Sequence, residues 1–179
     1  LEFRRVLFRS IHWIKDEVTS IDADARFIKM KRGQLSFDRL IIAPGIDFMY
    51  EQLPMLQSSE AQHIVPHAWK AGPQTVNLRL QLEAMADGGM FVMSIPKAPY
   101  RCPPGPYERV CQVAHYLKNN KPASKIIVLD ANPEIVSKKA LFTKVWAETY
   151  AGIIDYRPNS SLVDVDVKGR SVTTEFEVL

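Results

Sequence analysis

Cysteine and glycine are both scarce in this chain of 179 residues, which has 2 Cys and 8 Gly. Two cysteines are too few for a disulfide-rich fold, so they form one bridge, a redox pair or two unrelated thiols. Neither sign of charge dominates, because 23 basic and 20 acidic side chains give a net charge of +3. This bias is too weak to indicate a nucleic acid or a charged membrane as the partner. No apolar run approaches the roughly 20 residues of a transmembrane helix.

The composition, with 46% hydrophobic and 24% charged residues, is typical of a soluble globular protein. Residues 1–10, LEFRRVLFRS, lack an initiator Met, and their apolar stretch is too short for a signal peptide. We interpret residues 1–10 as a foreign, adapter-derived segment. The other end stops at Leu179 within an alternating strand pattern. We therefore expect the chain to be a fragment.

Residues 11–45 alternate between apolar and polar side chains, with turn signals at residues 22–24 and at Arg32-Gly33. This pattern predicts a small antiparallel meander. A short apolar run over residues 38–45, which we expect to be buried, follows it and ends at Ala43-Pro44-Gly45. Residues 46–73 have no sustained period and predict a linker or crossover.

From residue 74 onward, helical and strand patterns alternate. The spacing predicts helices over 74–87, 107–119 and 134–150, and strands over 90–95, 125–129 and 153–156. The first of these helices has Val76, Leu80 and Ala84 on one stripe. Such an order predicts a parallel sheet with right-handed crossovers, hence an α/β fold of the Rossmann-like, dinucleotide-binding kind. Residues 162–166 and 171–178 return to antiparallel alternation.

The loop after the first predicted parallel strand, residues 96–106, differs from a nucleotide-binding loop. A nucleotide-binding unit has G-x-G-x-x-G here, because glycine lets the backbone approach a pyrophosphate. This loop has Gly105 alone, and its five prolines remove N–H donors. We therefore expect neither NAD nor NADP to bind. Asp130, at the end of the next strand, is either a ribose ligand or a loop or cap residue.

A thiol stands where the glycines are missing. Cys102 lies just before a predicted helix start, where the helix dipole together with Arg101 and Arg109 favours the thiolate. Alternatively, Cys102 is a small filler in a tight loop. Glu108, in the first helical turn, is either a dipole-favoured surface residue or a carboxylate that moves protons for Cys102. Cys111 shares the apolar stripe of the helix, so we expect an inert core residue.

Histidine does not form a metal-binding pattern in this sequence. His63 and His67 are four residues apart, but Pro66 intervenes and no Cys or carboxylate joins them at ligand spacing, so we expect no metal site. Trp13, Trp69 and Trp146 are most simply core or interface residues. The chain has neither a G-x-S-x-G nor a Walker motif, so serine hydrolase and P-loop functions have no support.

Three segments together carry a family resemblance. They are Ala43-Pro44-Gly45-Ile46-Asp47, Pro66-His67-Ala68-Trp69-Lys70-Ala71-Gly72-Pro73-Gln74 and Tyr100-Arg101-Cys102-Pro103-Pro104-Gly105-Pro106-Tyr107-Glu108-Arg109. In these segments the chain resembles the flavoprotein subunit of flavocytochrome c sulfide dehydrogenase, a relative of sulfide:quinone oxidoreductase. The resemblance runs from about Val18 to the C-terminus, and the Cys-Pro-Pro-Gly-Pro-Tyr-Glu run is its most specific part.

The resemblance implies an FAD domain interrupted by a second, nucleotide-domain-like unit. Residues 11–60 would be part of the FAD-binding domain, with Ala43, Pro44 and Gly45 ending the strand beside the flavin. Residues 61–179 would be most of the second unit, truncated at its C-terminus. The FAD glycine motif, the flavin-linking Cys and a distal redox Cys would lie outside this chain. We therefore expect the chain alone to be inactive and to hold FAD poorly.

The resemblance also implies a reaction. In the family, the Cys matching Cys102 forms a redox disulfide with the distal Cys over the flavin, and the Glu matching Glu108 lies nearby. Sulfide attacks that disulfide, and electrons pass to FAD and then to a cytochrome c subunit. The resemblance implies a periplasmic location. Two alternatives remain. One is a sulfide:quinone oxidoreductase, which an amphipathic membrane-binding segment in the missing C-terminus would favour, and the other is a non-catalytic α/β docking domain in which Cys102 is inert.

Overall fold

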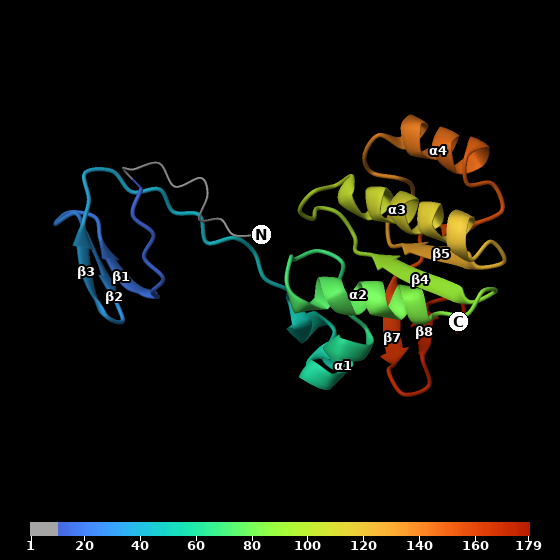
Figure 1. The fold of residues 1–179 in the computed structure, drawn as a ribbon, viewed down its shortest axis with the longest axis horizontal. Helices are drawn as coiled ribbons and strands as arrows, with labels where there is room; N and C mark the ends of the chain where they lie inside the picture. Colours follow the sequence, from blue (N-terminus) through green and yellow to red (C-terminus); the bar gives the residue numbers. More distant parts are fainter. Residues whose placement is uncertain (1–10) are drawn as a thin grey trace. The chain divides into compact units, whose positions relative to one another are not determined.

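The structure is a computed structural model that describes residues 11–179. The chain divides into two compact units, with the boundary between Asp47 and Phe48. Figure 1 labels their helices and strands. The foreign segment expected over residues 1–10 lies outside the described residues. The assignment of residues 11–60 and 61–179 to an FAD domain and a second domain stays a prediction.

The first unit contains the expected antiparallel meander. Its strands β1 (Val18–Asp22), β2 (Phe27–Met30) and β3 (Gly33–Ser36) lie in the order β1-β2-β3. None of these strands has a buried residue. The expectation of a buried apolar run over residues 38–45 is wrong, because the segment forms no strand and Ile41 is 91% exposed. Residues 11–47 contain no second layer against which these apolar side chains pack.

The second unit begins with short helical segments where the sequence predicted a linker. These are the 3-10 turns η2 (Tyr50–Gln52) and η3 (Pro54–Leu56) and the helix α1 (Ser59–Ile64). The Ser58 hydroxyl caps α1 by accepting a hydrogen bond from the amide of Ala61 at 3.1 Å. The next helix, α2 (Pro73–Ala84), has Pro73 in its first turn, where the missing N–H costs no helical hydrogen bond.

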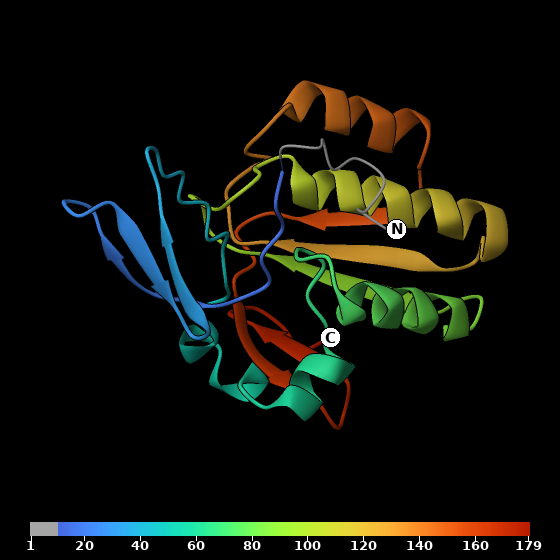
Figure 2. The ribbon, with the colours of Figure 1, turned by 60° about the vertical axis from the view of Figure 1, so that its left-hand side comes forward.

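A parallel sheet organises the rest of this unit, as predicted. Strands β4 (Met90–Ile95), β5 (Lys125–Asp130) and β6 (Ile154–Arg157) pair in the order β4-β5-β6. Helix α3 (Gly105–Asn120) connects β4 to β5, and α4 (Lys139–Glu148) lies between β5 and β6. Both of these helices lie on one side of the sheet and α2 lies on the other (Figures 1 and 2). The second unit is therefore a mixed α/β fold around a parallel sheet.

The core of this unit lies between α3, α4 and the sheet. The predicted apolar stripe of α3 faces this core, since its members Tyr107, Val110, Ala114 and Leu117 are buried and its member Cys111 is half-buried. Pro106 and Val113 of the same helix are buried as well. Aromatic rings of α3, α4 and β6 pack against one another, with Trp146 lying 6.2 Å from Tyr107 and 5.5 Å from Tyr156 between ring centroids. Such contacts stabilise a core beyond the area that they bury.

Two helices differ from their predicted form. Helix α4 begins at Lys139 rather than at residue 134, because Lys138 before it has a left-handed φ of 52° and interrupts the helical backbone. The stripe of α2 is not a buried face, since Val76 is 60% exposed and Leu80 is 58% exposed. Leu82 and Met85, at the end of α2, pack against the core instead.

A buried lysine joins the ends of two helices. Lys121, the residue that follows α3, is 9% exposed. Its ammonium donates hydrogen bonds to the carbonyls of Leu82 at 2.9 Å, Glu83 at 2.6 Å and Met85. These carbonyls belong to the last turn of α2 and its cap, where a cation is favoured by the helix dipole. Lys121 thereby ties α2 to α3.

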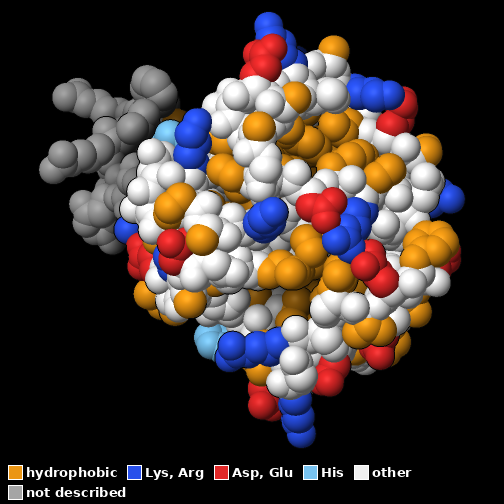
Figure 3. Space-filling model, turned by 90° about the vertical axis from the view of Figure 1, so that its right-hand side faces the viewer, with side chains coloured by type: hydrophobic (Ala, Val, Ile, Leu, Met, Phe, Trp, Pro, Cys, Tyr) orange, Lys and Arg blue, Asp and Glu red, His pale blue; other side chains and the backbone are white. Residues whose placement is uncertain are grey.

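The C-terminal part returns to antiparallel pairing, as predicted. Strand β7 (Leu162–Asp166) pairs with β8 (Ser171–Thr174), and an isolated bridge joins Thr173 to Val178. Basic, acidic and hydrophobic side chains are interspersed on the face shown in Figure 3. Within residues 11–179, none of the helices combines the length and apolar character needed to cross a membrane.

Candidate thiol site

The loop between β4 and α3 presents Cys102 to solvent. This residue has a left-handed φ of 58°, and its carbonyl accepts a hydrogen bond from the amide of Gly105 at 2.9 Å. The resulting turn leads directly into α3, which begins two residues earlier than predicted. Cys102 therefore precedes a helix start, as the sequence indicated.

Gly105 makes room for the thiol. A Cβ atom built on Gly105 would lie 3.2 Å from Sγ of Cys102 and 3.7 Å from the Trp69 ring. The Trp69 ring meets the Tyr100 ring edge-on, with 6.1 Å between centroids. Because it has no side chain, Gly105 thus leaves room for Sγ of Cys102 and for the edge of the Trp69 ring.

Local hydrogen bonds hold Trp69 in this place. The amide of Trp69 donates to Nδ1 of His67 at 3.2 Å, and the amide of His67 donates to the side chain of Gln74 at 3.0 Å. The Arg109 guanidinium donates to the carbonyl of Ala68 at 3.5 Å. Two of the three segments that carry the family resemblance, 66–74 and 100–109, therefore meet beside Gly105. The sequence pattern did not predict the contribution of Trp69 or Tyr100.

Cys111 has a different environment from Cys102, as predicted. It is half-buried and packs against the core, and Nε1 of Trp146 donates a hydrogen bond to its sulfur at 3.2 Å. Burial raises the pKa of the Cys111 thiol above its ordinary value. The two cysteines are both free thiols. Cys111 is thus a core residue whose environment disfavours the reactive thiolate.

Glu108 lies exposed in the first turn of α3. Burial is the largest cause of the raised pKa of Cys111, and the negative charge of Glu108, one turn earlier in the helix, raises that pKa further. A carboxylate in the first turn interacts favourably with the helix dipole. The role of Glu108 beside Cys102 stays a prediction.

Asp130 is fully buried, and its carboxylate is occupied by the chain itself. The hydroxyls of Tyr107 and Tyr156 donate to Oδ2 at 2.8 and 2.9 Å. The amide and the side chain of Asn132 donate to Oδ1 at 2.9 and 2.7 Å. These four hydrogen bonds saturate a carboxylate. Asp130 is therefore not placed to bind a ribose.

The end of the sheet at β4 and α3 does not fit a dinucleotide. Its loop contributes few N–H donors because of its prolines, Sγ of Cys102 occupies the space beside Gly105, and Asp130 is sequestered. Ala43, Pro44 and Gly45 belong to the first unit, where they form an exposed irregular segment and Gly45 has a φ of 80°. Their role in flavin binding stays a prediction.

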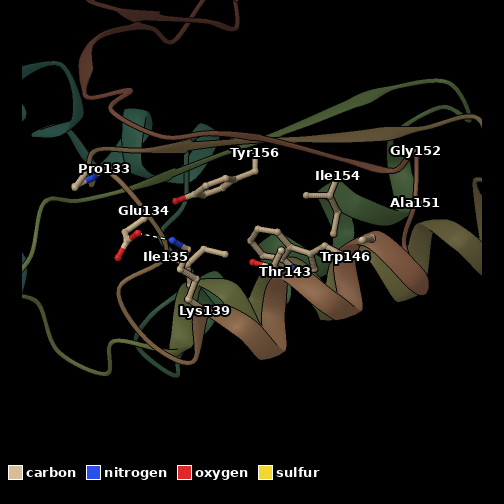
Figure 4. A pocket seen from close by; sticks show the side chains of 11 residues that line it. Pro133, Glu134, Ile135, Lys139, Thr143, Trp146, Ala151, Gly152, Ile154 and Tyr156 are labelled. Carbon is tan, nitrogen blue, oxygen red and sulfur yellow. Dashed lines mark hydrogen bonds and ion pairs between the residues drawn. The ribbon is translucent and has the colours of Figure 1, made fainter.

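A separate depression lies between α4 and β6. It has a volume of about 640 Å³ and is open to solvent. Figure 4 shows Trp146, Ile154 and Tyr156 lining it, with the ion pair of Glu134 and Lys139 at one end. No group of three side chains suited to hold a metal ion occurs in the part of the chain that the structure describes.

Fold and loop together define a parallel α/β domain that presents a thiol where nucleotide-binding domains present a glycine-rich loop. Residues 75–179 match the family model described as the central part of the flavoprotein chain of sulfide dehydrogenase (flavocytochrome c). The chain belongs to this family. The match includes Cys102, Glu108 and Asp130, and it begins after Ala43-Pro44-Gly45.

Proposed function

We propose that this chain is part of the FAD-containing subunit of a sulfide dehydrogenase, with Cys102 as its redox-active thiol and a cytochrome c subunit as its electron acceptor. The exposed thiol at the start of α3 carries this proposal. Ligands of open α/β sheets bind at the carboxyl ends of the strands, which is where Cys102 lies. In this proposal the second unit is a Rossmann-like domain that has lost nucleotide binding.

The proposed chemistry begins with hydrosulfide attack on a disulfide between Cys102 and a cysteine outside this chain. A new S–S bond forms to one sulfur of the disulfide, the old S–S bond breaks, and the other sulfur leaves as a thiolate. FAD, when bound in the subunit, accepts the two electrons that sulfide gives up. The Trp69 ring lies beside Gly105 of the Cys102 loop and meets the Tyr100 ring edge-on. The proton that the attacking hydrosulfide carries passes to the carboxylate of Glu108.

The flavin is proposed to be held by other segments of the protein, because the loop between β4 and α3 does not fit a pyrophosphate. Ala43, Pro44 and Gly45 are the residues of this chain assigned to it. The 179-residue chain alone is proposed neither to bind FAD tightly nor to oxidise sulfide. The protein is proposed to act in the periplasm.

The deciding experiment replaces Cys102 with Ser in the complete flavoprotein that contains this chain, assembled with its cytochrome c subunit. We expect sulfide-dependent reduction of cytochrome c to be abolished while the flavin content is unchanged, since an oxygen atom cannot form the disulfide. Cys111→Ser is the matched control and should retain most of the activity. Near-normal turnover by Cys102→Ser would refute the proposal and favour a docking role. Faster reduction of a soluble quinone than of cytochrome c would favour the quinone-linked alternative.

A further inference from the structure

The carboxylate of Asp130 is fully buried and has no part in the proposed chemistry. All four groups that donate to it are neutral. No Lys or Arg side chain among residues 11–179 forms an ion pair with it. Burying a carboxylate is costly unless it is hydrogen-bonded or paired, so the four hydrogen bonds of Asp130 offset this cost. Asp130 and its donors form one hydrogen-bonded unit. Both branches of this unit lead to the loop of Cys102.

The first branch runs through Asn132 to the beginning of the loop. The side-chain amide of Asn132 donates to the carbonyl of Pro96 at 3.0 Å as well as to Asp130. Its Oδ1 accepts a hydrogen bond from the amide of Ala98 at 2.8 Å. Because Pro96 and Pro99 have no N–H, the amide of Ala98 is one of few donors with which this stretch can be anchored.

The second branch runs through Tyr107 to the other side of the loop. The Tyr107 hydroxyl donates to Asp130 and accepts a hydrogen bond from the amide of Val136 at 3.2 Å. The Tyr100 hydroxyl lies 3.4 Å from the Tyr107 hydroxyl and 3.4 Å from the carbonyl of Pro103. Tyr100 precedes Cys102 by two residues and Pro103 follows it directly.

We propose that Asp130 is a positioning residue for Cys102, acting through Asn132 and Tyr107 on the two sides of the loop. Cys102 has a left-handed φ of 58°, which L side chains seldom adopt, so the surrounding contacts must hold it. The network supplies those contacts in a loop that has few backbone donors of its own. This inference deepens the proposed function, because the thiol that it positions is the proposed redox group.

Hydrogen exchange of the 179-residue chain, followed by NMR, tests the network. The probes are the amides of Ala98 and Gly105, which are bonded to Asn132 and to the carbonyl of Cys102. Asp130→Asn should release the acceptors of both amides and speed the exchange of each about fivefold, the factor expected when an amide loses one neutral hydrogen bond. The strong intraresidue HN–Hα cross-peak that marks the positive φ of Cys102 should weaken. A residue with a structural role alone would lower the urea midpoint and leave this cross-peak intact.

Two milder variants keep the test decisive if Asp130→Asn does not fold. Tyr107→Phe and Tyr100→Phe each remove one hydroxyl and keep the ring, and each should speed the exchange of Gly105. Tyr116→Phe is the matched control, because Tyr116 lies in α3 and its hydroxyl is outside the network. Unchanged exchange in both variants, or an equal change in Tyr116→Phe, would overturn the inference.

A further readout separates this inference from the proposed function. In the complete flavoprotein, Tyr100→Phe should lower kcat for sulfide at unchanged flavin content. If Cys102→Ser proves fully active, the proposed function fails, while the exchange of Ala98 and Gly105 still decides whether Asp130 positions the loop. If exchange is unchanged but Cys102→Ser is inactive, the positioning role alone is wrong.

Discussion

Replacing Lys121 with Met tests whether one buried ammonium fastens α2 to the rest of the second unit. The substitution keeps most of the apolar stem and deletes the donor to three carbonyls. A hydrogen bond to a charged group contributes about 1.5–3 kcal/mol, and the dehydration of a buried ammonium costs several kcal/mol in return. On balance, Lys121→Met should lower the free energy of unfolding by about 2 kcal/mol. At roughly 3 °C per kcal/mol for a chain of this size, Tm should fall by about 6 °C.

Thermal unfolding followed by circular dichroism measures this effect. Lys118→Met is the matched control, because Lys118 lies exposed in α3, just before Lys121, and donates to a single carbonyl, that of Thr149, at 3.0 Å. We expect its Tm to fall by less than about 2 °C, as for most surface substitutions. Equal shifts for the two variants would refute the reasoning, since they would mean that the three carbonyls of α2 are as well satisfied by water as by Lys121.

Three further outcomes are expected. Cys102 should be alkylated readily near neutral pH, while Cys111, whose thiol pKa is raised by burial, should resist until the chain is denatured; mass spectrometry after a short iodoacetamide pulse separates them, and equal labelling of folded protein would contradict this. Burial, with the hydrogen bonds around Asp130, raises the pKa of Tyr107 and Tyr156 well above 10. Above about pH 10 the unfolded chain therefore loses protons that the native state retains, and stability should fall as pH rises; urea midpoints at about pH 8 and pH 11 check this, and Tyr156→Phe should reduce the difference. Calorimetric titration should detect no binding of NAD or NADP, and a low-micromolar dissociation constant would show that the loop before α3 still holds a phosphate.

The parallel sheet and α3 were predictable because local patterns and burial agree there. Strand β5 is a continuous apolar run because it is the central strand, with neighbours on both sides. The buried residues of α3 follow helical spacing because one face of this helix packs in the core. The stripe of α2 has the same spacing, yet Val76 and Leu80 are exposed. Periodicity shows which residues share a face and does not show whether another element covers that face.

The thiol itself was found from the sequence, but its surroundings were not. In the sequence, Tyr107 is one member of the apolar stripe of a predicted helix. Its hydroxyl donates a hydrogen bond to Asp130, which is 23 positions further along the chain and is not part of that pattern. Asp130 lies at the end of a predicted strand, a position at which an acidic residue can bind a ribose. The donors that occupy its carboxylate instead come from α3, from β6 and from its own loop. Such a network depends on contacts between distant segments, which single-chain patterns do not record.

The prolines of the loop before α3 have an evolutionary consequence. A loop that lost phosphate binding through a single glycine substitution would regain it through a single reversal. Here five prolines would each have to be replaced to restore an N–H, the thiol beside Gly105 would have to be removed, and Asp130 would have to be released from four donors. No one of these changes alone provides a pyrophosphate site. Several substitutions together would therefore be needed to convert this loop into one.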